Sequence, residues 1–153
     1  MKDDIRVILA DNNVQDRESK KRLLNEQGIQ VVYETGDGKK ALENIKKLKP
    51  DVVVMDMILP GVDGLEILEE CREFTEYKPL FIIATALRRE GLIEQALAQG
   101  ANYYMMKPLS ATMLIKRIRQ IAASVGEGEE GQAAVHNSEE KQLVSAPEYT
   151  DTV

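Results

Sequence analysis

The sequence predicts an α/β fold, with a doubly wound, five-stranded parallel sheet of strand order 2-1-3-4-5. Over the first 125 residues, five short apolar segments alternate with five segments of helical periodicity. Such alternation, with short connections, predicts a parallel sheet covered by helices on both faces. Five strand–helix units suit the order 2-1-3-4-5, in which ligands bind outside the carboxyl ends of the first and third strands.

The first two units lie within residues 5–50. The apolar run IRVILA predicts a strand at residues 5–10, and the charged segment 14–27 predicts a helix that Gly28 ends. Leu23 and Leu24 are the apolar positions of that helix. The β-branched run at 29–34 predicts the second strand. Residues 37–49 have apolar side chains at a period of 3.6, which predicts a helix that Pro50 ends. These apolar residues are Ala41, Leu42, Ile45 and Leu48.

The other three units follow the most apolar run of the chain. Three valines and a methionine precede Asp56, and this run predicts a third strand at 52–56 that is buried on both faces. Further strands are predicted at 79–86 and 101–106, and helices at 64–74, 91–99 (ended by Gly100) and 110–123. Ser110 can cap the last helix. That helix is expected to point Met113, Leu114, Ile118 and Ile121 inward.

The net charge of −6 is concentrated at the end of the chain. The last 28 residues carry one lysine and seven acidic residues, so the first 125 residues are neutral. The segment 126–153 has no sustained periodicity and few large apolar side chains, which predicts a disordered acidic tail or interdomain linker after one folded domain at 1–125. Without a basic surplus, direct nucleic-acid binding by this chain is not expected.

The composition also bears on the compartment. A single cysteine, Cys71, excludes an internal disulfide and fits a reducing cytosol. Cys71 lies in a helical pattern and is interpreted as a packing residue. No run of about 18 apolar residues is present, so no membrane span is expected. The N-terminus lacks the long apolar core of a signal peptide, and a cytoplasmic location is predicted.

Polar residues follow the first and third strands at the predicted ligand site. Asp11 and Asn12 come after the first strand, and Asp56 ends the third. A carboxylate at the end of so apolar a strand is costly unless something compensates for it. Clustered oxygen ligands suit a hard cation, and Mg²⁺ typically binds one or two carboxylates, a carbonyl and waters. Such a cation would offset the repulsion between the two aspartates.

Two more strand ends carry groups that suit phosphoryl chemistry. The hydroxyl of Thr85 can bond a phosphoryl oxygen, and Lys107 can supply positive charge to the same group. Each residue also has an ordinary explanation on its own: Asp11 as a turn or cap residue, Thr85 as a strand residue, Lys107 as surface charge. Together these explanations require four coincidences at one rim, so the functional interpretation is favoured.

Four motifs stand in succession along the chain: ILADNN, VVVMDMILPGVDG, IIATA and GANYYMMKP. In their order and spacing they resemble the receiver domain of bacterial two-component response regulators. They cover about residues 5–123 and imply the flavodoxin-like (βα)5 receiver fold. Within the family, GANYYMMKP, DMILPGVDG and the tail look most like the receiver of the sporulation master regulator of endospore-forming bacteria.

The resemblance implies a phosphorylation-activated switch, with no enzymatic activity beyond its own phosphorylation and dephosphorylation. Asp56 matches the residue that accepts a phosphoryl group from a phosphohistidine donor. Thr85 and Lys107 match the phosphoryl-binding pair, and Tyr104 the aromatic switch residue. Lys107–Pro108 matches a cis peptide, which is cheap only before proline. The implied Mg²⁺ ligands come from Asp11, Asn12, Asp56 and the Ile58 backbone carbonyl.

The implied partner is a histidine kinase or a histidine phosphotransferase. The face made by the fourth helix, fifth strand and fifth helix, around residues 88–99 and 103–119, would be the output surface and could carry a dimer contact. A DNA-binding domain could follow residue 153.

Two other functions were considered. Asn12 stands where the family usually has a second acid, which favours a phosphate-independent protein-binding module with weakened metal binding as the alternative. A haloacid-dehalogenase-like phosphatase needs an aspartate two residues after the first, where Ile58 stands, and is disfavoured.

Overall fold

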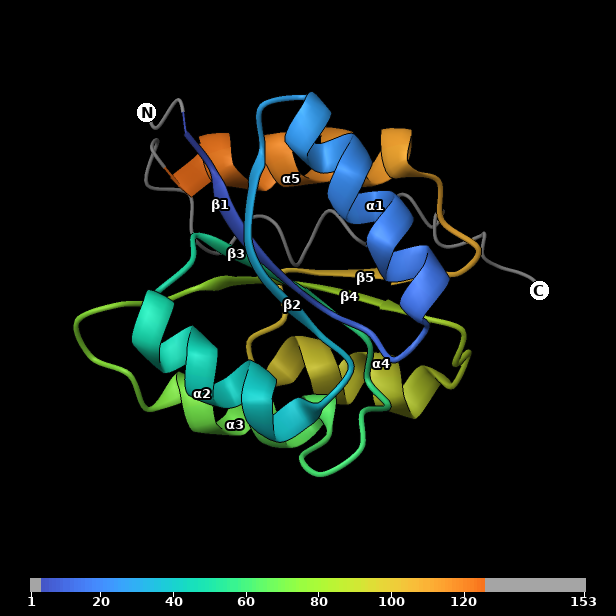
Figure 1. Cartoon of the computed structure of the whole chain (residues 1–153). Coiled ribbons are helices and arrows are strands. Elements are labelled where there is room, and N and C mark those ends of the chain that lie inside the picture. Colours follow the sequence, from blue (N-terminus) through green and yellow to red (C-terminus); the bar gives the residue numbers. More distant parts are fainter. Residues whose placement is uncertain (1–3, 126–153) are drawn as a thin grey trace.

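The computed structural model describes residues 4–125, which form five strands and five helices in strict alternation (Figure 1). The strands are β1 (Arg6–Ala10), β2 (Gln30–Thr35), β3 (Val52–Met55), β4 (Leu80–Thr85) and β5 (Tyr103–Met106). The helices are α1 (Val14–Glu26), α2 (Gly38–Leu48), α3 (Gly64–Arg72), α4 (Glu90–Ala98) and α5 (Ala111–Val125). All strand pairs are parallel and the order is β2-β1-β3-β4-β5. The predicted fold class and strand order are confirmed.

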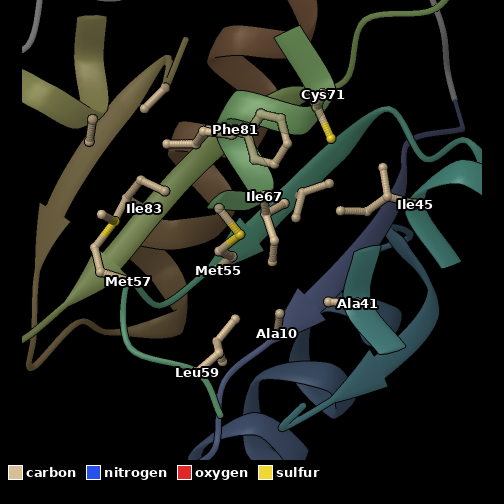
Figure 2. Close-up of a cluster of buried hydrophobic side chains, with 14 of the residues drawn as sticks. Ala10, Ala41, Ile45, Met55, Met57, Leu59, Ile67, Cys71, Phe81 and Ile83 are labelled. Carbon is tan, nitrogen blue, oxygen red and sulfur yellow. The ribbon is translucent and has the colours of Figure 1, made fainter. Parts of the chain in front are cut away.

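The sheet separates two layers of helices. Figure 1 shows α1 and α5 on one face and α2, α3 and α4 on the other. Each face has its own apolar cluster. Figure 2 shows the cluster on the α2–α3 side, where Ile67 lies close to Met55 of the central strand. All four residues of β3 are buried, because helices cover this strand on both sides.

Cys71 lies in this same cluster and is buried. Burial raises the pKa of its thiol to about 12, so the thiolate that a nucleophile requires is scarce at neutral pH. The interpretation of Cys71 as a packing residue is supported.

One predicted core position is wrong. Leu114, Ile118 and Ile121 of α5 are buried as expected, but 41% of Met113 is exposed. The three buried residues recur at intervals of four and three, which places them on one side of the helix. Met113 stands one residue before Leu114 and is rotated about 100° away from that side. Its backbone N–H is held by the hydroxyl of Ser110 at 3.1 Å, which confirms Ser110 as the cap.

Most of the helices that begin at the carboxyl end of the sheet have a side-chain cap. Asn13, Asp37 and Asp63 each accept hydrogen bonds from backbone N–H groups of α1, α2 and α3, and Asp63 forms a capping box with Glu66. The exception is α4, whose N-cap residue Arg89 makes no side-chain cap hydrogen bond. The start of α4 therefore lacks the side-chain cap that α1, α2 and α3 have.

The loop after β3 is fixed by close backbone contacts. The N–H of Gly38 donates to the carbonyl of Pro60 at 2.9 Å. A Cβ at Gly38 would lie 1.6 Å from the carbonyl oxygen of Val62, and a Cβ at Gly64 would lie 2.9 Å from Cα of Met57. Only glycine permits either approach. The segment that follows Asp56 is thus clamped against the start of α2.

The predicted tail, residues 126–153, lies outside the described residues. Between residues 4 and 125, none of the helices has both the length and the apolar character that a bilayer crossing requires.

Candidate functional site

Four strand ends converge at one edge of the sheet. Asp11 follows β1, Asp56 follows β3, Thr85 ends β4, and Lys107 follows β5. The Lys107 ammonium lies 2.5 Å from an Asp11 carboxylate oxygen and 3.0 Å from an Asp56 carboxylate oxygen. The fold therefore brings together the two carboxylates and the ammonium that the sequence placed at this rim.

Lys107 provides much of the compensation that a carboxylate at this strand end requires. The Asp56 side chain is only 13% exposed, and Asp11 and Lys107 are similarly covered. Burial by itself would lower the pKa of Lys107, but its hydrogen bonds and charge interactions with Asp11 and Asp56 outweigh burial and raise that pKa. The lysine therefore stays cationic at neutral pH and offsets the repulsion between the two carboxylates.

The second oxygen of each aspartate binds its own loop. Asp11 Oδ1 accepts a hydrogen bond from the N–H of Asn13 at 3.0 Å, and Asp56 Oδ1 accepts one from the N–H of Ile58 at 3.2 Å. The Ile58 side chain is 56% exposed, so its backbone, and not its side chain, contacts the site. Asn12 is exposed beside Asp11. The loops after β1 and β3 thus face each other with oxygen-rich groups.

The donor set fits Mg²⁺ but not a metal that needs many charged ligands. Within residues 4–125, no group of three His, Cys, Asp or Glu side chains is placed to hold a metal ion. The ligands that the resemblance implies are instead two carboxylates, the amide of Asn12 and the Ile58 carbonyl, which belong to the loops after β1 and β3. Mg²⁺ keeps several waters and needs only one or two carboxylates, so these groups suffice for it.

Thr85 and Tyr104 both contact the loop between β4 and α4. Thr85 is 1% exposed, and its hydroxyl accepts a 3.4 Å hydrogen bond from the N–H of Leu87. The hydroxyl of Tyr104, which is buried, donates to the carbonyl of Leu87 at 3.1 Å. The backbone N–H of Lys107 donates to the Thr85 carbonyl at 2.9 Å. Thr85 is therefore linked to Tyr104 through Leu87 and to Lys107 through the backbone, and the Lys107–Pro108 peptide is cis.

Arg17 is a residue of this region that the sequence did not reveal. Its guanidinium donates to the backbone carbonyl of Asp11 at 2.5 Å and to Glu34 of β2 at 2.8 Å. An arginine in α1 and a glutamate in β2 are each common surface residues. The parallel pairing of β1 with β2 brings them together. The predicted strand order implied that pairing, and it was the one indication of the contact that the sequence offered.

The chain resembles known proteins in sequence and in fold. The family model for the response regulator receiver domain matches residues 7–119. The transcriptional regulatory protein PdtaR of Mycobacterium tuberculosis is 34% identical over 129 residues, which are 80% of this chain and 62% of PdtaR. The transcriptional regulatory protein TrcR of the same organism is 38% identical over 120 residues, which are 75% of this chain and 44% of TrcR. The chain thus spans less than two thirds of either relative.

A solved structure agrees with these sequence matches. The signal receiver domain of the response regulator NarL from Mycobacterium tuberculosis superposes with a TM-score of 0.74 at 31% sequence identity, covering 80% of this chain and 98% of that one. The span of the family model, residues 7–119, includes all four strand ends of the site. The chain belongs to the response regulator receiver domain family.

Proposed function

We propose that the chain is a phosphorylation-activated signalling switch, which accepts a phosphoryl group on Asp56 from a phosphohistidine donor with the help of Mg²⁺. The observation that carries the proposal is the placement of Lys107 between Asp11 and Asp56. A lysine so placed can turn toward the new negative charge when a phosphoryl group is added to Asp56. Membership of the receiver family supports the same chemistry.

Asp56 is the proposed nucleophile. One carboxylate oxygen attacks the phosphorus, the bond from phosphorus to the donor nitrogen breaks, and the electron pair leaves with the imidazole. Asp11, Asn12, Asp56 and the Ile58 carbonyl would hold Mg²⁺, which would supply positive charge to the phosphoryl oxygens. Lys107 and the hydroxyl of Thr85 are the proposed partners of those oxygens, because Lys107 already contacts Asp56 at 3.0 Å and Thr85 ends β4, the strand next to β3.

The proposed readout begins at Thr85. Phosphorylation adds negative charge and acceptor oxygens at Asp56. A shift of Thr85 toward these oxygens would disturb its hydrogen bond with the Leu87 N–H. The Leu87 carbonyl also binds the Tyr104 hydroxyl, so the disturbance would reach Tyr104. The signal would then reach the face made by α4, β5 and α5, which we propose as the output surface and as a possible dimer contact.

The partners follow from the same proposal. The donor is a histidine kinase or a histidine phosphotransferase, and the setting is the cytoplasm. PdtaR and TrcR are both named transcriptional regulatory proteins and extend beyond the matched region. A DNA-binding domain after residue 153, joined by the acidic segment 126–153 as a linker, is therefore proposed. The motifs GANYYMMKP and DMILPGVDG support a narrower proposal, that the parent protein regulates sporulation.

Intact mass spectrometry tests the central step. The protein is incubated with acetyl phosphate or phosphoramidate and Mg²⁺, and the gain of one phosphoryl group is followed. Asp56→Asn is expected to abolish that gain. Asp51→Asn is the matched control, because Asp51 lies at the opposite end of the same strand, where its side chain accepts a hydrogen bond from the N–H of Arg6. Phosphorylation of Asp56→Asn at the wild-type level would refute the assignment.

Asn12 favours one alternative, a receiver-like module that binds partners without phosphate. The family's usual second acid is absent at this position, which removes one negative charge from the metal pocket. A folded wild-type protein that gains no phosphoryl group, at any Mg²⁺ concentration, would favour this alternative.

A further inference from the structure

We infer that Arg17 is a positioning residue for the metal pocket: it holds the loop that carries Asp11 and Asn12, and thereby sets the Mg²⁺ affinity of the site. The inference rests on the proposed function, because it concerns the same pocket. Arg17 itself touches neither Asp56 nor the implied metal ligands' side chains in any hydrogen bond of the described residues. It acts through the backbone of Asp11.

The guanidinium is a fork between two chain segments. Nε donates to Glu34 Oε1 at 2.8 Å, and Nη1 donates to the Asp11 carbonyl at 2.5 Å. The Arg17 side chain is only 14% exposed, so solvent does little to weaken these bonds. Burial by itself would raise the pKa of Glu34, but hydrogen bonds and charge interactions with Arg17 and Lys21 lower it overall. Glu34 is therefore a permanent anion at neutral pH.

Besides Arg17, the loop is supported by Lys107 at the Asp11 carboxylate and by the Asn13 cap of α1. The N–H of Asp11 donates to the carbonyl of Thr35 at 2.9 Å, and the N–H of Asn13 donates to the Asp11 carboxylate at 3.0 Å. At Gly36 a Cβ would lie 3.1 Å from Cα of Asn12 and 3.2 Å from Nη1 of Arg17. The absence of a side chain at Gly36 thus leaves the space in which guanidinium and loop meet.

Charge and position predict opposite effects for Arg17. As a nearby cation, it repels Mg²⁺, so a purely electrostatic role would make its removal tighten metal binding. As a support for the loop, it keeps Asp11 and Asn12 in position, so its removal would weaken metal binding. Position matters more here than in a pocket with three carboxylates, because the neutral amide of Asn12 binds a cation only when its oxygen points at the ion. Residues that orient metal ligands commonly change metal affinity by tenfold or more.

The experiment compares Arg17→Lys, Arg17→Met and Lys21→Met with the wild type. Arg17→Lys keeps the positive charge but cannot donate along two directions from one planar group. Lys21→Met is the matched control: Lys21 binds the other oxygen of Glu34 at 3.2 Å, one turn further along α1, and no hydrogen bond joins it to the loop. Mg²⁺ is titrated while the amide shifts of Asp56 and Ile58 are followed by NMR.

Arg17→Lys and Arg17→Met are expected to bind Mg²⁺ about tenfold more weakly than the wild type, whereas Lys21→Met binds equally well or slightly better. Without metal, hydrogen exchange at the Asn13 amide is expected to be faster in Arg17→Lys, because the loop is released. Phosphorylation of Asp56 in that variant should recover at saturating Mg²⁺. Arg17→Lys serves on its own if Arg17→Met does not fold.

Unchanged or tighter Mg²⁺ binding by Arg17→Lys, in a wild type that binds Mg²⁺ and is phosphorylated on Asp56, would overturn this inference and leave the proposed function intact. A folded wild type that binds no Mg²⁺ and gains no phosphoryl group would overturn both. Equal losses in Arg17→Lys and Lys21→Met would show a general effect of α1 and would also overturn the inference.

Discussion

The hydroxyl of Tyr104 donates to the backbone carbonyl of Leu87 across 3.1 Å. This bond joins the edge strand β5 to the loop two residues beyond Thr85. The same residue, Leu87, gives its N–H to the hydroxyl of Thr85. A movement of either side chain therefore changes the environment of the other, and substitutions at Tyr104 report on this coupling.

Tyr104→Phe is expected to keep the buried ring and remove only the bond to Leu87. The loss should cost about 0.5–1.5 kcal/mol in the free energy of unfolding, the usual range for one such hydrogen bond. Urea denaturation measures it, with Tyr33→Phe on the opposite edge strand as the control. Equal stability of Tyr104→Phe and wild type would mean that the bond contributes nothing.

Stability is expected to fall steeply in alkaline solution. Burial raises the pKa of Tyr77 and of Tyr104, and neighbouring negative charges add to it. Both side chains stay protonated in the folded protein after the unfolded chain begins to ionise near pH 10. Above about pH 10 the folded state therefore binds more protons than the unfolded state. The free energy of unfolding keeps its full value below about pH 10 and decreases above it. Removing either hydroxyl by mutation to phenylalanine should flatten the decrease, as measured by denaturation at several pH values.

Asn12→Asp is expected to raise Mg²⁺ affinity by about one to two orders of magnitude, or roughly 1.4–2.8 kcal/mol. A carboxylate and an amide can present an oxygen in the same place, so the geometry is retained and one negative charge is gained beside the dication. Amide shifts near Asp56 during a Mg²⁺ titration measure the change. Equal affinities would show that the amide substitutes fully for the acid.

The phosphorylated state is expected to last for many minutes or longer. Ile58 and Leu87 stand two residues beyond Asp56 and Thr85, and in the family these positions flank the path of the attacking water. Apolar side chains cannot orient that water by hydrogen bonds. Phosphate release after removal of the donor gives the rate, and Ile58→Asn should accelerate it. A wild-type lifetime of seconds would contradict the explanation.

A chain that ends at residue 125 is expected to fold and to be phosphorylated as the full chain is. Residues 126–153 offer few large apolar side chains, so they have little surface to bury against the domain. Thermal or urea denaturation compares the two chains. A loss of more than about 1 kcal/mol, beyond the usual effect of a surface change, would show that the segment packs on the domain.

The sequence predicted the strands, their order and the converging strand ends, because these depend on periodicity and on general rules for parallel sheets. Leu114, Ile118 and Ile121 could be placed by helical spacing alone. The same spacing excludes Met113 from that side, because it stands one residue before Leu114 and about 100° away around the helix. The inward position of Met113 was predicted from its apolar character, and apolar character does not say which side of a helix faces the core.

The candidate site was predicted as a set of residues but not as a network. Lys107 was expected at the rim, yet its simultaneous contact with Asp11 and Asp56 depends on side-chain conformation. Arg17 escaped notice for a related reason. Its partners lie in the preceding loop and in a neighbouring strand, and local sequence patterns carry no information about such contacts.

The structure around Asp56 is packed differently on its two sides. On the α2–α3 side, Gly38 and Gly64 let backbone meet backbone, and dense packing of this kind resists displacement. On the α4 side, the helix begins at Arg89 without a side-chain cap. If Asp56 is phosphorylated as proposed, we therefore expect the structure to rearrange mainly toward α4 and β5, where the resting packing resists least.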